Sequence, residues 1–148
     1  MDEQQTTSIR GLGEIALRVD DLDGMRAFYE DVVGLRLMKR FEHAVFLRIA
    51  EGYGGHTQIL ALFDRAAAPN RPDFFETTFR GVDQPGSPLD HLAFEIDLSN
   101  IETERRRLES LGVEIKPDEF GFVHWRSIFF RDPEGNMVEF VAYDESVT

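Results

Sequence analysis

The chain has no cysteine, so chemistry must come from its 4 histidines, its 28 acidic residues and its side-chain hydroxyls and amides. Disulfides, thiolate metal ligands and cysteine nucleophiles are therefore excluded. Two glutamates lie among apolar residues: Glu14 is in an alternating apolar segment, and Glu139 stands between Met137-Val138 and Phe140-Val141. A buried carboxylate without a partner is costly. Each glutamate therefore needs a cation or a hydrogen-bond donor.

An internal repeat relates Glu14 to a histidine. Residues 12–19 (LGEIALRV) align without gaps with residues 89–96 (LDHLAFEI), and apolar residues match at every second place. This alternation predicts a strand in each segment. The chain therefore contains one unit twice, with Glu14 and His91 at equivalent positions.

A helix is predicted after each of these strands, near Leu22 to Val33 and near Asn100 to Leu111. Gly34 and Gly112 follow them as typical residues after a helix end. The segment Ser99-Asn100-Ile101-Glu102 has the spacing of a capping box. The apolar stripes are Leu22, Met25, Ala27, Phe28 and Val32 in the first helix, and Ile101, Leu108 and Leu111 in the second.

The period of two returns after each helix, so each half is predicted to be a βαβββ module. The further strands are expected at Leu35 to Arg40, Ala44 to Ile49 and Thr57 to Phe63, and then at Val113 to Lys116, Val123 to Phe130 and Met137 to Tyr143. We therefore predict an α+β fold in a single domain, 1–148, with modules at about 12–64 and 89–144. One helix covers only one face of a four-stranded sheet, so the modules should pair about a pseudo-twofold axis and enclose a cleft.

The segment between the modules, residues 65–88, is predicted to be a long connection because it contains four prolines and two glycines. Its aromatic residues, Phe74, Phe75 and Phe79, are expected to pack on the body of the protein or to cover a cavity.

Composition limits the partners. A length of 148 residues with 42% hydrophobic content suits one compact domain, and a net charge of −12 repels nucleic acids and anionic membranes. No apolar run approaches the ~20 residues of a membrane span, and residues 1–5 lack the features of a signal peptide. We expect a cytoplasmic protein that binds neither nucleic acid nor membranes.

Three segments resemble the vicinal oxygen chelate superfamily, which includes glyoxalases, bleomycin resistance proteins and extradiol dioxygenases. They are residues 27–35 (AFYEDVVGL), 89–94 (LDHLAF) and 129–140 (FFRDPEGNMVEF), the last being very close to the family's closing motif. The resemblance covers about residues 12–144. It implies the glyoxalase/bleomycin resistance/dihydroxybiphenyl dioxygenase-like fold and a small-molecule substrate or ligand. Exposed sheet edges favour a homodimer, and the modules could pair within one chain or across that dimer.

Metal-using members of this family place one ligand on the first strand and one on the last strand of each module. The resemblance assigns His91 and Glu139 in the second module, and Glu14 in the first, where many relatives have His or Gln. The fourth place falls in residues 56–62, where His56, Gln58, Leu60 and Leu62 share one face. Gln58 is the first choice, His56 the second, and Leu60 would leave three ligands.

Metal-free readings of these residues stay open. Glu14 could pair with an arginine (Arg18, Arg48 or Arg126), and His56 or Gln58 could only line the cleft. On a neighbouring predicted strand, Trp125 and Ser127 share one face and His124 and Arg126 the other. One of these pairs could help to line the cleft, or Trp125 could instead pack in the core. The turn at 132–135 is expected to have no chemical role.

The ligand set suits Ni²⁺, Mn²⁺, Fe²⁺, Co²⁺, Zn²⁺ or Mg²⁺ without selecting among them. The resemblance then favours a metal-dependent, glyoxalase-like lyase or isomerase acting on a small substrate with vicinal oxygens, with Glu14 or Glu139 moving a proton. The alternative is a metal-free protein that sequesters a cationic drug in an acidic groove. An extradiol dioxygenase is disfavoured because Glu14 replaces one of its histidines, and fosfomycin-type thiol transfer because Ala16 replaces an expected hydroxyl.

Overall fold

The computed structural model describes residues 11–67, 89 and 91–148, and the first half of the chain folds as one βαβββ module. Asp21 caps the first helix by accepting a hydrogen bond from the Gly24 amide at 3.0 Å, and Gly34, with a φ of +94°, ends the helical segment. The elements are β1 (Glu14–Val19), α1 (Leu22–Ala27), a π-helical continuation (Phe28–Val33), β2 (Arg36–Arg40), β3 (Ala44–Glu51), a 3₁₀ turn (Tyr53–Gly55) and β4 (Thr57–Asp64).

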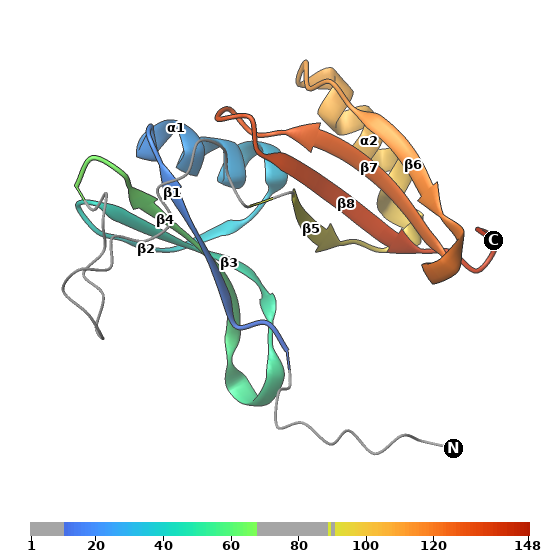
Figure 1. Ribbon diagram of the computed structural model, residues 1–148, viewed down its shortest axis with the longest axis horizontal. Helices are drawn as coiled ribbons and strands as arrows, with labels where there is room; N and C mark the ends of the chain where they lie inside the picture. Colours follow the sequence, from blue (N-terminus) through green and yellow to red (C-terminus); the bar gives the residue numbers. More distant parts are fainter. Residues whose placement is uncertain (1–10, 68–88, 90) are drawn as a thin grey trace.

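The second half repeats the order of the first. Its elements are β5 (His91–Glu95), a 3₁₀ turn (Leu98–Asn100), α2 (Ile101–Ser110), β6 (Lys116–Phe120), a 3₁₀ turn (Gly121–Val123), β7 (Trp125–Arg131) and β8 (Met137–Tyr143). The sheets have the orders β1-β4-β3-β2 and β5-β8-β7-β6, and in each the first and last strands of the module pair in parallel. Figure 1 shows the two sheets side by side. The predicted α+β fold of two βαβββ modules is confirmed.

Two local predictions in the second module were wrong. The strand expected at Val113 to Lys116 lies later, at Lys116–Phe120, because Val113 and Ile115 pack against the core instead of pairing with β7. The capping box does not form, because Ser99 lies inside the 3₁₀ turn Leu98–Asn100 instead of at the N-cap of α2, and Glu102 pairs with Arg105.

The start of β7 also differs from the prediction. The strand expected from Val123 begins at Trp125, after a 3₁₀ turn and after His124, whose φ is +58°. A left-handed residue of this kind interrupts the extended backbone on which the period of two depends.

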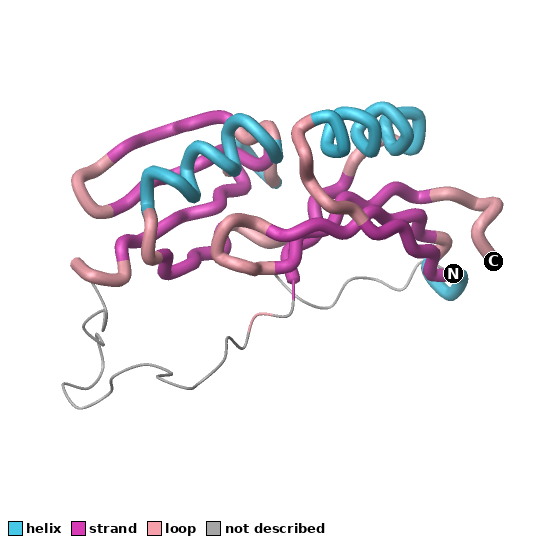
Figure 2. Tube along the Cα trace, turned by 90° about the horizontal axis from the view of Figure 1, so that it is seen from above, coloured by secondary structure: helices cyan, strands magenta, loops and turns pink. Residues whose placement is uncertain are grey.

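The hydrophobic core lies between each sheet and its helix and continues from one module into the other. Met25 and Tyr29 from the first helical segment, with Leu60 and Leu62 from β4, are fully buried. The rings of Phe28 and Phe130 lie 6.3 Å apart and join the two halves of the core. Figure 2 shows the two helical segments next to each other along one side of the molecule. The opposite face of each sheet is its open face, and it carries Glu14 in the first sheet and His91 and Glu139 in the second.

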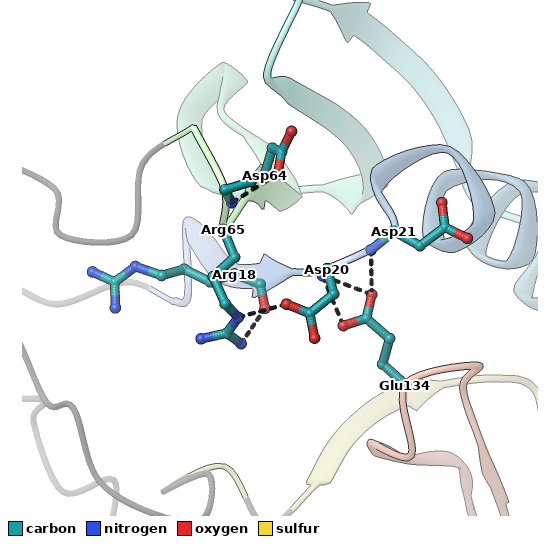
Figure 3. Close-up of polar contacts among 7 residues, drawn as sticks. Arg18, Asp20, Asp21, Asp64, Arg65 and Glu134 are labelled. Carbon is teal, nitrogen blue, oxygen red and sulfur yellow. Dashed lines mark hydrogen bonds and ion pairs between the residues drawn. The ribbon is translucent and has the colours of Figure 1, made fainter.

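The turn at 132–135, which was expected to have no chemical role, joins the modules. Asp132 is 4% exposed and accepts a 2.8 Å hydrogen bond from the Tyr29 hydroxyl. Burial, and then the Asp132 carboxylate, raise the pKa of Tyr29 far above its usual value. The Glu134 carboxylate accepts hydrogen bonds of 2.9–3.1 Å from the backbone amides of Asp20 and Asp21, as Figure 3 shows.

The prediction for Phe74, Phe75 and Phe79 concerns residues outside the described ranges. Within those ranges, no helix is long and apolar enough to cross a membrane.

Candidate functional site

The open face of the second sheet brings His91 and Glu139 together. On the parallel strands β5 and β8, His91 is opposite Met137 and Ala93 is opposite Glu139, so the two side chains are diagonal neighbours on one face. The distance from His91 Nε2 to Glu139 Oε2 is 3.2 Å. The side chains that the resemblance assigned to the second module therefore form one pair.

Glu139 is a buried carboxylate with a partner on each oxygen. Its side chain is 2% exposed, and Ser127 Oγ donates a 2.6 Å hydrogen bond to Oε1 while His91 faces Oε2. Ser127 on β7 thereby fixes the orientation of the carboxylate. The period of two predicted the face shared by Trp125 and Ser127 but not the bond from Ser127 to Glu139, because a period indicates a face and not a partner.

His91 is the accessible member of the pair. Its side chain is 39% exposed, and its ring forms a T-shaped contact with the ring of Phe129, with the centroids 6.1 Å apart. A metal ion or a substrate could therefore approach the imidazole from solvent, with Glu139 directly behind it.

Glu14 lies on the open face of the first sheet and is exposed. Within the described ranges it forms no ion pair with Arg18, Arg48 or Arg126, and Arg126 is instead bound to Glu119 and Asp144. The arginine-paired reading of Glu14 therefore finds no support.

The register of the first sheet identifies the counterpart of Glu139. Ala16 is opposite Ala61, as Ala93 is opposite Glu139, so the fourth ligand position is occupied by an alanine. Gln58 lies on the other face of β4, the one that carries the buried Leu60 and Leu62. The register therefore favours a site of three ligands over one completed by Gln58.

The two candidates on and before β4 have other surroundings. Gln58 lines, with Glu14, a cleft of about 470 Å³ at the junction of the modules, and His56 is an exposed residue just before the strand. Gln58 therefore reaches a cleft, as one of the open readings allowed.

The candidates do not all meet within one chain. Among the described residues, no group of three His, Asp or Glu side chains is arranged to hold a metal ion. His91 and Glu139 form a pair in the second sheet, whereas Glu14 belongs to the first. A single chain thus presents two donors in one place and a third donor in another.

The geometry of the His91–Glu139 pair suits a divalent metal ion. Two ligand atoms that are each about 2.1 Å from one metal ion, with a right angle between the two bonds to the ion, lie about 3.0 Å from each other. The 3.2 Å between Nε2 and Oε2 is close to this separation, and Ser127 already orients the carboxylate. The pair would hold the ion through one imidazole nitrogen and one carboxylate oxygen.

A second cavity, of about 520 Å³, lies at the other end of the same open face. Among the residues that line it are Glu95 and Asp97, Asn100, and the aromatic residues Trp125 and Tyr143. The sequence indicated that one face of β7 could line a cleft, but it did not indicate that Trp125 shares this cavity with the acidic end of β5.

Solved structures resemble this chain over most of its length. Lactoylglutathione lyase from Agrobacterium tumefaciens is 27% identical, with a TM-score of 0.70 and coverage of 92% of this chain and 96% of that one. An integron cassette protein from the mobile metagenome of the Halifax Harbour sewage outfall is 25% identical, with a TM-score of 0.65 and coverage of 90% and 99%.

The fosfomycin resistance protein FosX from Listeria monocytogenes, as a variant complexed with Mn(II) and 1S,2S-dihydroxypropylphosphonic acid, is 22% identical. Its TM-score is 0.62, with coverage of 91% and 93%, and this likeness concerns the fold alone. No curated protein sequence matches the chain. The sequence model of the Glyoxalase/Bleomycin resistance protein/Dioxygenase superfamily matches residues 11–140. The chain therefore belongs to this superfamily.

Proposed function

We propose that the protein is a divalent-metal-dependent lyase or isomerase that acts on a small substrate with vicinal oxygens. The observation that carries the proposal is the His91–Glu139 pair, with its donor atoms 3.2 Å apart and its carboxylate oriented by Ser127. The likeness to lactoylglutathione lyase supports the reaction class. A bound divalent cation would supply Lewis-acid polarisation of the substrate oxygens.

We propose that the third ligand, Glu14, comes from a second copy of the chain. Within the described ranges, Glu14 lies on a different sheet from His91 and Glu139 and no third acidic or histidine side chain joins the pair. A homodimer that places the first sheet of one copy over the second sheet of the other would complete the site. The exposed edges of both sheets support such an assembly.

We assign different roles to the residues of the proposed site. His91 and Glu139 hold the ion, and Ser127 keeps the carboxylate in place. Glu14 is exposed and, in the described ranges, has no ion pair, so it is the better candidate to take a proton from the substrate carbon next to a carbonyl. Glu139 remains the second candidate for this role, but its burial favours a ligand.

A second function, metal-free binding of a cationic small molecule, is supported by a different observation. The cavity with Glu95, Asp97, Trp125 and Tyr143 is acidic and aromatic and needs no metal ion. An extradiol dioxygenase stays disfavoured, because Glu14 stands where the resemblance asks for a histidine.

Metal uptake tests the proposed function. We expect the wild-type protein to bind Mn²⁺, Ni²⁺, Fe²⁺, Co²⁺ or Zn²⁺ in calorimetry, and His91→Ala to lower the affinity by more than about tenfold. His43→Ala is the matched control, because His43 is an exposed histidine of the first module. Absence of uptake by wild type, or equal affinity in His91→Ala, would leave the binding protein as the better reading.

Light scattering tests the assembly. The monomer has a mass of 17.0 kDa, and the composite site requires a particle of about twice that mass. A 17.0 kDa particle at micromolar concentration would exclude the composite site.

A further inference from the structure

The cavity at the far end of the second sheet is built by strand register. Trp125 on β7 is directly opposite Tyr143 on β8, and Glu95 on β5 is directly opposite Val141, the residue two places before Tyr143. Directly opposed residues and residues two apart share one face. Glu95, Val141, Trp125 and Tyr143 therefore stand together on the open face, and their cavity has a volume of about 520 Å³.

The aromatic walls of the cavity are accessible. Trp125 is 39% exposed and Tyr143 is 59% exposed, although both are large apolar side chains. The Tyr143 ring is positioned by His124, whose ring meets it edge-on with centroids 5.9 Å apart and whose Nδ1 lies 2.7 Å from the Val147 carbonyl oxygen. The exposed parts of these two rings offer a binding surface for an organic cation.

The remaining walls supply negative charge. Glu95 and Asp97 line the cavity, and within the described ranges neither side chain takes part in an ion pair or hydrogen bond. Asn100 also lines it, and its amide is not used to cap α2. Arg126 follows Trp125 in sequence, but it points to the other face and is held by Glu119 and Asp144. Among the described residues that line the cavity, none is basic.

We propose that this cavity binds an organic ammonium ion. Aromatic faces attract cations through the ring quadrupole, and two carboxylates without counter-ions add attraction at a partly enclosed site. The Asn100 amide can exchange hydrogen bonds with a hydroxyl on the ligand. A neutral ligand recognised only by its shape would not require the carboxylates of Glu95 and Asp97.

The ammonium site adjoins the proposed metal centre but uses different side chains. Glu95 is four residues beyond His91 on β5, about 13 Å away at a rise of about 3.3 Å per residue, whereas Val141, which also lines the cavity, is only two residues beyond Glu139 on β8. The inference rests on the second function proposed above, binding of a cationic small molecule, and not on the metal-dependent reaction. If both hold, the cationic group marks the end of the substrate that is remote from the reacting oxygens.

Choline and its neutral isostere 3,3-dimethyl-1-butanol test the proposal. They have the same shape and the same hydroxyl, and only choline is charged. Trp125 is the single tryptophan of the chain, so its fluorescence reports directly on the cavity. We expect choline to change the emission with a dissociation constant in the millimolar range or below, and the isostere to bind at least about tenfold more weakly.

Two pairs of variants locate the effect. Trp125→Leu should weaken choline binding, measured by calorimetry, by about threefold to thirtyfold, while Trp125→Tyr should retain most of the affinity because it keeps a π-face. Glu95→Gln should also weaken binding. Glu51→Gln removes the same charge from an exposed strand residue of the first module and should leave the affinity unchanged.

Three results would overturn the proposal: no binding of choline at millimolar concentration, equal binding of choline and its isostere, or equal losses in Glu95→Gln and Glu51→Gln. The first two would remove the cation site, and the third would reduce it to an effect of net charge. Because the assay uses no metal ion and no turnover, its failure is distinguishable from failure of the metal centre.

Discussion

The open faces of the two sheets have equivalent backbones and different side chains. At matching positions the second sheet carries His91 and Glu139, and the first carries Glu14 and Ala61. The two modules therefore share the strand register but not the candidate ligands. The second module contains a formed donor pair, whereas the first offers one exposed carboxylate, so neither module would be expected to hold an ion alone with three ligands.

The same difference extends across the sheets. Around Glu139 the second sheet has the Ser127 hydroxyl and the His91 imidazole, both polar. The first sheet instead presents the rings of Phe46 and Phe63, whose centroids lie 5.9 Å apart. Under the proposed assembly, one module supplies the polar centre, and the other supplies an apolar wall and a base.

The largest effect is expected from Glu14. Replacement by Gln keeps an oxygen donor but removes the base, so turnover should fall on the order of 10²-fold or more while metal binding is retained. Exchange of α-protons into deuterated water, across a panel of hydroxy- and keto-carbonyl compounds, measures the loss. No exchange with any loaded metal, together with oxygen uptake on a catechol, would contradict this reading in favour of a dioxygenase.

Mixing of variants tells whether the two modules of one site come from different chains. A heterodimer of Glu14→Gln and Glu139→Gln chains would contain one intact site if the site is composite, and none if each site lies within one chain. Random mixing should therefore restore about a quarter of wild-type turnover in the composite case. Absence of any recovery would place the site within a single chain.

The next effect is expected at the donor pair. Glu139→Gln replaces the anionic ligand by a neutral amide and should lower divalent-metal affinity by more than about tenfold in calorimetry, without unfolding the protein. Gln58→Ala is the informative control, because Gln58 lies on the opposite face of its sheet and should leave the affinity unchanged. A tenfold loss in Gln58→Ala would restore Gln58 as the fourth ligand and contradict the register argument.

The fold was predictable because alternation and helix ends are local properties of the chain. The repeat of residues 12–19 in 89–96 indicated two modules, and the structure has them. The strand at Lys116–Phe120 was missed because it contains Pro117, which is disfavoured within strands except at edges, and β6 is an edge strand. Val113 and Ile115 have the alternation of a strand but serve the core.

The site was predictable in part. The assignments of His91 and Glu139 rested on motifs and lead to a pair in contact. The fourth candidate position could be Gln58 or Ala61, the counterpart of Glu139, depending on which face of β4 the helix covers. The period of two cannot distinguish the two faces. The repeat is likewise silent on whether modules pair within a chain or between chains, because both arrangements use the same residues.

A smaller effect is expected where the modules join. Tyr29→Phe removes the hydrogen bond to buried Asp132 and should lower the free energy of unfolding by about 1–2 kcal/mol. The pKa of Tyr29 is raised in the folded state. The stabilisation that its protonated hydroxyl gives to the folded protein is therefore fully present below the unfolded-state pKa of about 10, and it is lost as the pH rises above that value. The stability difference between wild type and variant in urea titrations should therefore narrow above about pH 10. A difference that stays constant there would mean that the hydroxyl contributes through packing alone.

The smallest effect is expected at Glu134. Its carboxylate accepts hydrogen bonds from the backbone amides of Asp20 and Asp21 at the start of α1. The side chain of Asp20 in turn accepts a 2.9 Å hydrogen bond from Arg65 Nε (Figure 3). Glu134→Gln keeps one acceptor oxygen but removes the charge that favours the amino end of the helix, so we expect a loss of about 0.5–1 kcal/mol in urea unfolding.

Because the Glu134 bonds cross between the modules, the loss should shift the unfolding midpoint of both modules together and leave a single transition. Glu109→Gln on α2 is the control, since Glu109 pairs with Arg105 within its own helix. Glu109→Gln should lower the free energy of unfolding by less than Glu134→Gln, because exposed ion pairs within a helix contribute only about 0.3–0.5 kcal/mol. If Glu134→Gln instead splits unfolding into two transitions, the turn at 132–135 is the main coupling between the modules, and the shared core around Phe28 and Phe130 contributes less than its burial implies.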